Sequence, residues 1–317
     1  MMRRSLLVAC AMMLSQAALA QEGVTRLVVS FPPGGPVDTV ARALAEQLSH
    51  ELGGTVLVVN KPGANGAIAA QEVAQSKPDG TTLWLSSVGA VAINPSLYPH
   101  LAYNMARDFT PVGRVVNNVE VLVTNDANPA KDAAAFVAAS KVAKEPTPMG
   151  STGVGSVPHL AIEQLAEATG ARLLHVPYKG AAPANTDLLG GQISGMFGDI
   201  AGLVGLIHGG KLRALGVAAP TRSPVLPGVK TLAEQGIQGV DTNNWYGLFA
   251  PAKTPAAKVA SLNLAVTKAL NTPALHDKLQ ALGSDPAPST PAELAALLAA
   301  DTAKWGRLIK AKHIRIQ

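Results

Sequence analysis

The stretch FPPGGPVDTVARALAEQLS, residues 31–49, places prolines and glycines between an apolar run and a helical pattern. The apolar run VTRLVVS (24–30) predicts a strand, and the residues after the glycines predict an amphipathic helix. The apolar face of that helix carries Val37, Val40, Ala41, Leu44 and Leu48. A strand, a short Gly/Pro loop and a helix in this order are typical of one unit of an α/β sheet.

The same order recurs along the chain, which predicts an α/β fold with a largely parallel sheet. Further strands are predicted at TVLVVN (55–60), TTLWLSS (81–87), VEVLVTN (119–125), ARLLHVPY (171–178) and ISGMFGD (193–199). Helices are predicted over 67–75, 130–143 and 159–169, and the chain from Pro255 to the C-terminus is expected to be helical. In open α/β sheets, ligands bind at the carboxyl ends of the strands, where the Gly/Pro/Ser loops of this chain gather.

The loop at 31–38 has the composition of an anion site at a helix N-terminus. With Gly35 as N-cap and Pro36 at the first helical position, the helix begins without losing a backbone donor. Gly34 and Gly35 carry no side chain, so a ligand can approach the N–H groups at the positive end of the helix dipole. Asp38, at the third position, is expected to cap the helix. The alternative is that FPPGG is only a tight turn.

The loop PMGSTGVGSVPHLAIEQL (148–165) repeats this composition in the second half of the chain. Bare glycines and short hydroxyls alternate in it: Gly150, Ser151, Thr152, Gly153, Gly155 and Ser156. Ser156 is expected to cap the following helix, and the hydroxyls are expected to hold a ligand. His159 falls in the first helical turn, either as a ligand contact or as a structural donor. Pro158 stands where a dinucleotide motif needs its third glycine, which excludes that motif.

A third loop, HVPYKGAAPANTDLLGGQISGMF (175–197), begins in a predicted strand. Tyr178 and Lys179 fall at the end of that strand, at the edge where a ligand is expected. The alternatives are a packed aromatic for Tyr178 and an ordinary surface lysine for Lys179. The residues leave both interpretations open.

Residues 1–20 have the pattern of a secretory signal peptide, with two arginines, an apolar stretch and the A-x-A cleavage site ALA at 18–20. Cleavage after Ala20 predicts an exported, periplasmic protein that begins at Gln21. The rival interpretation is a lipobox before Cys10, but the apolar stretch there is shorter than a typical signal-peptide core. Since Cys10 is the only cysteine, the cleaved chain has neither a disulfide nor a thiol nucleophile.

Composition excludes several classes of protein. Without residues 1–20 the chain has 24 basic and 21 acidic residues, a net charge of +3 that suits a small anion. The clustered basic face of a nucleic-acid-binding protein is missing, so no nucleic-acid partner is expected. The sequence has no G-x-S-x-G or H-E-x-x-H motif and no metal-ligand spacing among its histidines, so neither a metal nor another cofactor is expected. No later apolar run reaches the ~18 residues that span a bilayer.

Several motifs in this order resemble the tripartite tricarboxylate transporter substrate-binding proteins, also called the Bug family. They are VVSFPPGGPVDTVARALAEQL, VLVVNKPGANG, KPDGTTL, DFTPV, GSTGVGSVPHLAIEQL, HVPYKGAAPANTDLLGGQIS, GKLRALGV and WYGLFAPAKTPAAKV. The resemblance covers nearly the whole chain after residue 20. It implies a type II periplasmic binding protein fold, in which two lobes are joined by a hinge and hold a carboxylate in the cleft between them. One departure is Lys61 of KPGANG, where the family more often has an arginine.

The resemblance also implies which loops contact the ligand. These are Phe31 to Asp38 with Pro33, Gly34 and Gly35, Ser86 to Val91 with Ser87, Gly89 and Ala90, Gly150 to His159, and Tyr178 to Gly180 with Lys179. Asp199, at the end of a predicted strand, is implied to close the cleft.

Two extended stretches, 119–125 and 240–255, are interpreted as the crossings between the lobes. Each separates blocks that have complete strand–helix units of their own. Lobe 1 is therefore expected to comprise residues 21–124 with 246–317, and lobe 2 residues 125–245.

The sequence thus predicts a monomeric solute-binding protein that captures a small carboxylate and delivers it to the permease subunits of a membrane transporter. Its lobes are expected to close because the ligand makes contacts that the open state lacks. One alternative is a ligand-dependent partner of a membrane sensor kinase. Another is a periplasmic α/β enzyme, for which the chain offers no evident nucleophile or metal site. The identity of the carboxylate is left open.

Overall fold

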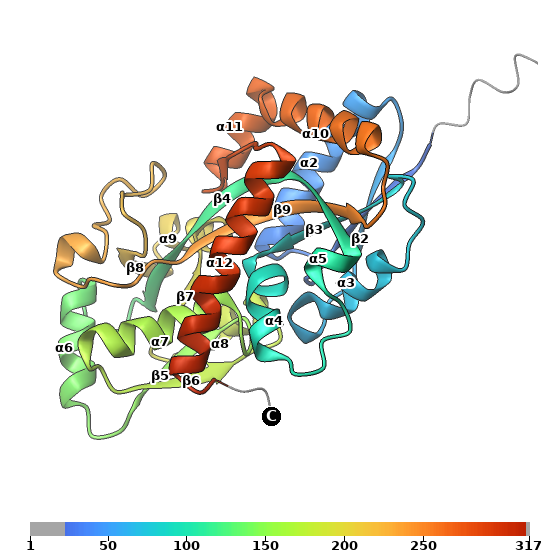
Figure 1. The fold of residues 1–317 in the computed structure, drawn as a ribbon. Helices are drawn as coiled ribbons and strands as arrows, with labels where there is room; N and C mark the ends of the chain where they lie inside the picture. Colours follow the sequence, from blue (N-terminus) through green and yellow to red (C-terminus); the bar gives the residue numbers. More distant parts are fainter. Residues whose placement is uncertain (1–22, 315–317) are drawn as a thin grey trace, which may run out of the picture.

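The computed structural model describes residues 23–314 (Figure 1), and the predicted signal peptide and cleavage site lie outside them. The strands are β1 (Thr25–Val29), β2 (Val56–Asn60), β3 (Thr82–Ser87), β4 (Phe109–Asn125), β5 (Thr147–Ser151), β6 (Leu173–Pro177), β7 (Gly195–Asp199), β8 (Leu212–Val217), β9 (Asn243–Pro251) and β10 (Asp285–Pro286). The main helices are α2 (Pro36–Leu52), α3 (Ala67–Ala74), α6 (Ala133–Val142), α7 (Val157–Thr169), α8 (Ala181–Leu189), α9 (Ile200–His208), α10 (Ala256–Leu270), α11 (Pro273–Ala281) and α12 (Pro291–Ala311). Short helical turns are η1 (Ala64–Gly66), η2 (Gly89–Ile93), α4 (Asn94–Leu97), α5 (Met105–Asp108) and η3 (Ala233–Gln235). Between residues 23 and 314, no helix is long and apolar enough to cross a membrane.

Lobe 1 is built on a sheet in the order β2-β1-β3-β9-β4, with β10 paired to β4. β1 lies parallel to β2 and β3. On one face, α2, α10 and α11 pack in a cluster that contains Leu44 and Leu262, and on the other, α3 and α12 pack with Trp84 and Trp245. Both faces are therefore covered, as expected for strands with apolar residues on both sides.

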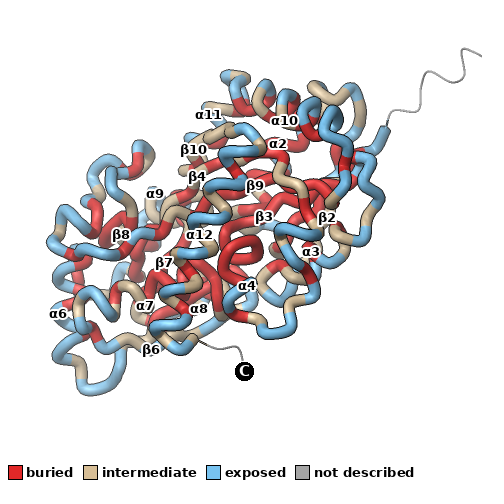
Figure 2. Tube along the Cα trace, in the orientation of Figure 1, coloured by how far each residue is buried: buried red, intermediate tan, exposed pale blue. Residues whose placement is uncertain are grey.

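Lobe 2 repeats this design with the strand order β6-β5-β7-β4-β8. β5 lies parallel to β6 and β7. Helices α6 and α7 pack on one face around Phe136 and Ile162, and α8 and α9 pack on the other around Leu188 and Ile200. Figure 2 shows the buried strands inside both lobes and the exposed residues on the outer helices.

Two long strands connect the lobes, and they change the predicted sheet type. β4 pairs antiparallel with β9 from Phe109 to Val119 and then continues into lobe 2, where it pairs with β7 from Glu120 onward and with β8. The prediction of a largely parallel sheet is wrong around the crossings, because β4 runs antiparallel to β7, β8, β9 and β10, and β9 runs antiparallel to β3. The lobe boundaries at 124/125 and 245/246 stay a prediction.

The C-terminal segment from Pro255 was expected to be helical and forms α10, α11 and α12, with β10 before α12. Pro273 begins α11 and Pro291 begins α12. A proline fits the first helical position because its missing N–H has no intrahelical partner there. Each of these prolines therefore starts a new helix.

Helix α12 lies across both lobes (Figure 1). Trp305 and Ile309 share one buried cluster with Leu160 of α7, although α12 begins on lobe 1. Lys312 pairs with Glu167 of α7 at 3.3 Å. The helix thus contacts lobe 2 through both apolar packing and an ion pair.

The predicted N-cap residues of the two ligand-loop helices are confirmed, although α7 begins two residues before the predicted 159. Helix α2 begins at Pro36 with Gly35 as its N-cap. Helix α7 begins after Ser156, whose Oγ accepts the N–H of His159 at 3.4 Å. Both starts follow directly from the local sequence.

Candidate functional site

Two adjacent cavities lie among the loops that follow β1, β5 and β6. The main cavity has a volume of about 620 Å³ and is bounded by the loops at 30–32, 62–66, 152–154 and 178–180. The side cavity measures about 90 Å³ and is bounded by the start of α2, the start of α8 and the end of β7. The two cavities share walls from both lobes, which places them in the cleft.

Ten of the predicted site residues line these cavities: Phe31, Pro33, Gly35, Ser87, Thr152, Gly153, Tyr178, Lys179, Gly180 and Asp199. Nine others line neither cavity: Gly34, Asp38, Ser86, Gly89, Ala90, Ser151, Gly155, Ser156 and His159. The loops of both helix N-termini are thus brought together at one place. The assignment of individual residues to ligand binding stays a prediction.

Asp38 organises the loop before α2. Its side chain is 2% exposed, and Oδ2 accepts the Gly34 N–H at 2.8 Å and Nε of Arg42 at 2.9 Å. Oδ1 accepts Nδ2 of Asn60 at 2.8 Å. Burial by itself would raise the pKa of Asp38, but the bonds from Arg42, Gly34 and Asn60 hold that pKa below its usual value. Because Gly34 donates to Asp38, its N–H is already occupied.

The residues behind the second glycine loop form a structural network. Oγ of Ser151 lies 2.6 Å from Nε2 of His175, and the rings of His175 and His159 are stacked with centroids 3.7 Å apart. Nδ1 of His159 accepts the Gly155 N–H at 3.1 Å. His159 is therefore a structural acceptor in this conformation, and its ring supports the loop from behind.

The residues at the end of β3 and directly after it are mostly engaged in packing. Oγ of Ser86 shares a hydrogen bond of 2.8 Å with Oγ of Ser30, whereas Ser87 lines the side cavity. Gly89 and Ala90 are buried in the π-helical turn η2. A Cβ at Gly89 would lie 2.9 Å from Oδ1 of Asn65, so the glycine lets η2 approach the 62–66 loop.

The polar groups at the cavity walls suit an anion. Lys179 and Thr152 line both cavities. Lys179 is exposed and, among residues 23–314, forms no ion pair. Val37 lines the side cavity in the first turn of α2, where a backbone N–H has no intrahelical partner. A cation, a hydroxyl and a helix N-terminus thus border the cleft.

The 62–66 loop lines the main cavity, although sequence reasoning assigned it no ligand role. Asn65 adopts φ 47°, and its Nδ2 donates to Oδ1 of Asn94 at 2.9 Å and to the Gly155 carbonyl at 3.1 Å. The second bond joins lobe 1 to lobe 2. The two glycines of KPGANG could have indicated a loop with an uncommon backbone conformation. Tyr98 also lines the cavity, but nothing in the sequence around it indicates a ligand site.

The lobes touch across the cleft at two glycines. A Cβ at Gly155 would lie 2.1 Å from Cδ1 of Leu97, and a Cβ at Gly180 would lie 3.5 Å from Cγ of Pro32. Together with the Asn65 bond, these approaches describe a closed cleft.

Asp199 lies at the end of β7 and lines the side cavity. Oδ2 accepts the Tyr246 hydroxyl at 2.5 Å, and Oδ1 accepts Nδ2 of Asn244 at 2.9 Å. Burial raises the pKa of Asp199 to about 6, although these bonds act in the opposite direction. Since Tyr246 and Asn244 belong to β9, Asp199 contacts a strand that joins the lobes.

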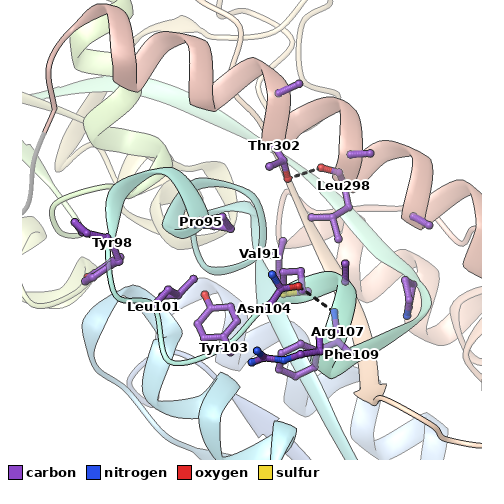
Figure 3. A pocket seen from close by; sticks show the side chains of 17 residues that line it. Val91, Pro95, Tyr98, Leu101, Tyr103, Asn104, Arg107, Phe109, Leu298 and Thr302 are labelled. Atoms are coloured by element: carbon purple, nitrogen blue, oxygen red, sulfur yellow. Dashed lines mark hydrogen bonds between the residues drawn. The ribbon is translucent and has the colours of Figure 1, made fainter.

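A separate cavity of about 890 Å³ lies between α12 and the segment from Val91 to Pro111. Figure 3 shows Tyr103, Asn104 and Phe109 on one side and Leu298 and Thr302 of α12 on the other. Of the predicted ligand loops, this cavity is lined only by Val91, the last residue of the 86–91 loop. Tyr98 borders both this cavity and the main cavity.

An α/β fold of two lobes, joined by two long strands and holding a cavity among helix N-termini, defines a solute-binding protein of the periplasmic binding protein class. The chain belongs to the tripartite tricarboxylate transporter family receptors, whose family model matches residues 40–314. Protein BugT of Bordetella pertussis is 34% identical over 286 residues, which cover 90% of this chain and 88% of BugT.

Solved structures agree with this assignment. The structure of an R. palustris protein with adipate has a TM-score of 0.89 and 31% identity, and the match covers 93% of this chain and 99% of that protein. MatC of Rhodopseudomonas palustris with bound malate has a TM-score of 0.84 and 33% identity, with 90% and 99% covered. The periplasmic binding protein BugD has a TM-score of 0.88 and 33% identity, with 94% and 100% covered.

Proposed function

We propose that this protein captures a small carboxylate in the periplasm by hinge closure and delivers it to the permease of a tripartite tricarboxylate-type transporter. The observation that carries the proposal is the pair of cavities between the lobes. The starts of α2 and α8 border the side cavity, and Lys179, which forms no ion pair within residues 23–314, borders both cavities. Helix N-termini bind anions because their N–H groups and dipoles are already oriented. Relatives solved with adipate and malate support the same ligand class.

Binding is coupled to closure through groups of both lobes. Phe31 and Pro32 from lobe 1 and Thr152 and Lys179 from lobe 2 border the same space. A ligand that touches both walls stabilises the closed state, because in the open state it can contact the wall of only one lobe. Such a change requires no bond to be made or broken, and in this proposal the protein acts as a receptor.

Delivery follows from the same change of shape. A permease that recognises surfaces of both lobes discriminates the closed, loaded receptor from the open one, because only closure places these surfaces in register. The partner is thus the membrane part of the transporter, and the compartment is the periplasm, in agreement with the description of the relative BugD as a periplasmic binding protein.

The test is calorimetry on protein purified from the periplasm, with straight-chain carboxylic acids and with the matching primary amides. We expect acids to bind and amides to fail. Lys179→Met should lower the affinity for the best acid about tenfold, since a hydrogen bond to a charged group contributes about 1.5 to 3 kcal/mol and solvent weakens it at an exposed site.

Lys211→Met is the matched control, because Lys211 is exposed and lines neither cavity. It should bind like the wild type. Equal binding of acids and amides, or equal effects of the two lysine variants, would contradict the carboxylate site.

A further inference from the structure

Two acidic side chains are opposed where β4 enters lobe 2. Glu120 of β4 and Asp199 of β7 are direct partners in the antiparallel register. Glu120 is 0% exposed, and Asp199 lines the side cavity. Directly opposite residues point to the same face of a sheet with Cβ atoms about 5 Å apart, so the two carboxyl groups are neighbours.

The contacts around the pair come from β9. Nδ2 of Asn244 donates to both acids, at 3.1 Å to Oε1 of Glu120 and at 2.9 Å to Oδ1 of Asp199. The Tyr246 hydroxyl donates to Oδ2 of Asp199 at 2.5 Å. Oε2 of Glu120 is buried and has no partner among the described residues. One carboxyl oxygen at the centre of this cluster thus lacks a donor.

No basic side chain of residues 23–314 forms an ion pair with either acid. Tyr246 is the other titratable group in contact, and burial followed by the charge of Asp199 raises its pKa, so it stays a neutral donor. Lys179 borders the same cavity but is exposed on its rim. Within the described part of the chain, the pair is therefore not neutralised by an ion pair with a basic side chain.

Two adjacent carboxylates in a dry site do not both ionise, because each charge disfavours the other and burial disfavours both. Burial, followed by the charge of Asp199, raises the pKa of Glu120 well above its usual value. A proton on Oε2 of Glu120 also supplies the missing hydrogen bond, since the protonated acid can donate to Asp199. The pair then carries one negative charge, on the member that borders the cavity.

We propose that Glu120 and Asp199 share one proton and place a single negative charge at the side cavity, which makes Asp199 a determinant of ligand specificity. The inference rests on the proposed carboxylate-receptor function. The ligand's carboxylate binds in the main cavity near Lys179, and its far end lies beside Asp199. That far end is uncharged or donates a hydrogen bond, because a second carboxylate there meets the like charge of Asp199, with which no basic side chain of residues 23–314 forms an ion pair.

The remaining walls of the side cavity agree with this ligand class. They are mostly apolar and include Phe31, Pro33, Pro36, Val37 and Pro183. Such walls accept an alkyl group, and Asp199 accepts a hydrogen bond from a hydroxyl or an ammonium group. Adipate and malate carry two carboxylates each, so they are expected to bind this receptor poorly, although related proteins hold them.

The test compares three series of straight-chain acids from three to eight carbons at pH 8: monocarboxylates, ω-hydroxy acids and dicarboxylates. Calorimetry on protein purified from the periplasm should give at least tenfold tighter binding for the best monocarboxylate or hydroxy acid than for the dicarboxylate of equal length. Asp199→Asn should reduce this preference at least tenfold by improving dicarboxylate binding. Glu120→Gln is the matched control, because its amide replaces the protonated acid and leaves the charge of Asp199 in place, so the preference should persist.

A wild-type protein that binds a dicarboxylate more tightly than its monocarboxylate partner would overturn the inference and leave the carboxylate receptor intact. An Asp199→Asn variant that weakens all three series equally would overturn it as well. Failure of every acid to bind the wild type would instead contradict the proposed function itself. The wild-type series distinguishes these outcomes even if a variant fails to fold.

Discussion

Two stacked histidines, His159 and His175, support the ligand loop of lobe 2, with their ring planes 11° apart. Because Nδ1 of His159 accepts the Gly155 N–H, the ring carries its proton on Nε2 and is neutral. Burial, followed by the charge of His175, lowers the pKa of His159 to about 3. Burial lowers the pKa of His175 to about 4. The loop therefore depends on two rings that must stay uncharged.

Acid is predicted to destabilise the protein through these rings. Unfolded histidines take up protons near pH 6.5, whereas the folded pair does so only near pH 4 and 3. Between pH 6.5 and pH 4 the unfolded state therefore binds more protons than the folded state. The free energy of unfolding falls as the pH drops through this range. Each ring contributes at most about 1.4 kcal/mol per pH unit, and the partly exposed His175 contributes less. Urea unfolding at several pH values measures the slope.

His159→Gln isolates the contribution of one ring, because the amide oxygen can still accept the Gly155 N–H. We expect a shallower slope between pH 4.5 and 6.5. His100→Gln removes an exposed histidine and should leave the slope unchanged. An unchanged slope in His159→Gln would show that the pair does not govern acid stability.

Sequence reasoning succeeded at residues whose role is local. Gly35 and Ser156 cap the helices that they precede, because capping depends only on neighbours in the chain. The stacking of His159 on His175 depends on how α7 packs over β6, which no spacing reveals. The carboxylate of Asp38 was correctly placed at the helix start, but its partner Asn60 comes from another strand.

Helix α12 begins with a side-chain capping box, whereas the neighbouring helices α10 and α11 have no side-chain cap. Oγ1 of Thr290 accepts the Glu293 N–H at 3.2 Å, and Oε2 of Glu293 accepts the Thr290 N–H at 2.8 Å. This capping box fixes the start of the helix that contacts both lobes.

Removing the cap should lower the stability of the whole chain. Thr290→Ala is expected to reduce the free energy of unfolding by about 1 kcal/mol, because the Glu293 N–H loses the hydroxyl that accepts it. Thr290→Ser keeps the hydroxyl and should lie close to the wild type. Thermal and urea unfolding measure the difference, and a Thr290→Ala variant as stable as the wild type would contradict a structural role for this cap.

At the scale of elements, the strand–loop–helix units were predictable because each is formed by one continuous stretch of the sequence. The direction of β4 and β9 was not, since antiparallel pairing between strands more than a hundred residues apart depends on how the lobes are connected. The three C-terminal helices were merged in the prediction, although Pro273 and Pro291 are signals for new helix starts. No ligand role was predicted for the 62–66 loop, because its reach into the cleft depends on the packing of η2 against Asn65.

Closure of the whole molecule requires a glycine at the start of α7. Gly155 has φ 77°, and a Cβ there would lie 2.1 Å from Cδ1 of Leu97 on the opposite lobe. Leu97 is 4% exposed and packed in a buried cluster, so its side chain has little room to move away. The closed state therefore tolerates no side chain at this position, whereas an open state has no such contact.

Gly155→Ala is predicted to weaken ligand binding at least tenfold by holding the lobes apart. Gly170→Ala is a matched control, because Gly170 ends the same helix with φ 70° and a Cβ there would meet nothing within 4 Å. Both variants should lose about 1 to 2 kcal/mol of stability from the left-handed backbone. Only Gly155→Ala should lose affinity, as measured by calorimetry.

Solution scattering tests whether the loss of affinity in Gly155→Ala comes from impaired closure of the lobes. The wild type should become more compact when its acid binds, since two connecting strands let the lobes rotate as rigid bodies. Gly155→Ala should compact less at saturating ligand, and adding Leu97→Ala should restore both compaction and affinity, because the shortened side chain makes room for the new methyl group. If the double variant binds as weakly as Gly155→Ala alone, the clash with Leu97 is not what opposes closure, and the loop conformation of Gly155 itself governs binding.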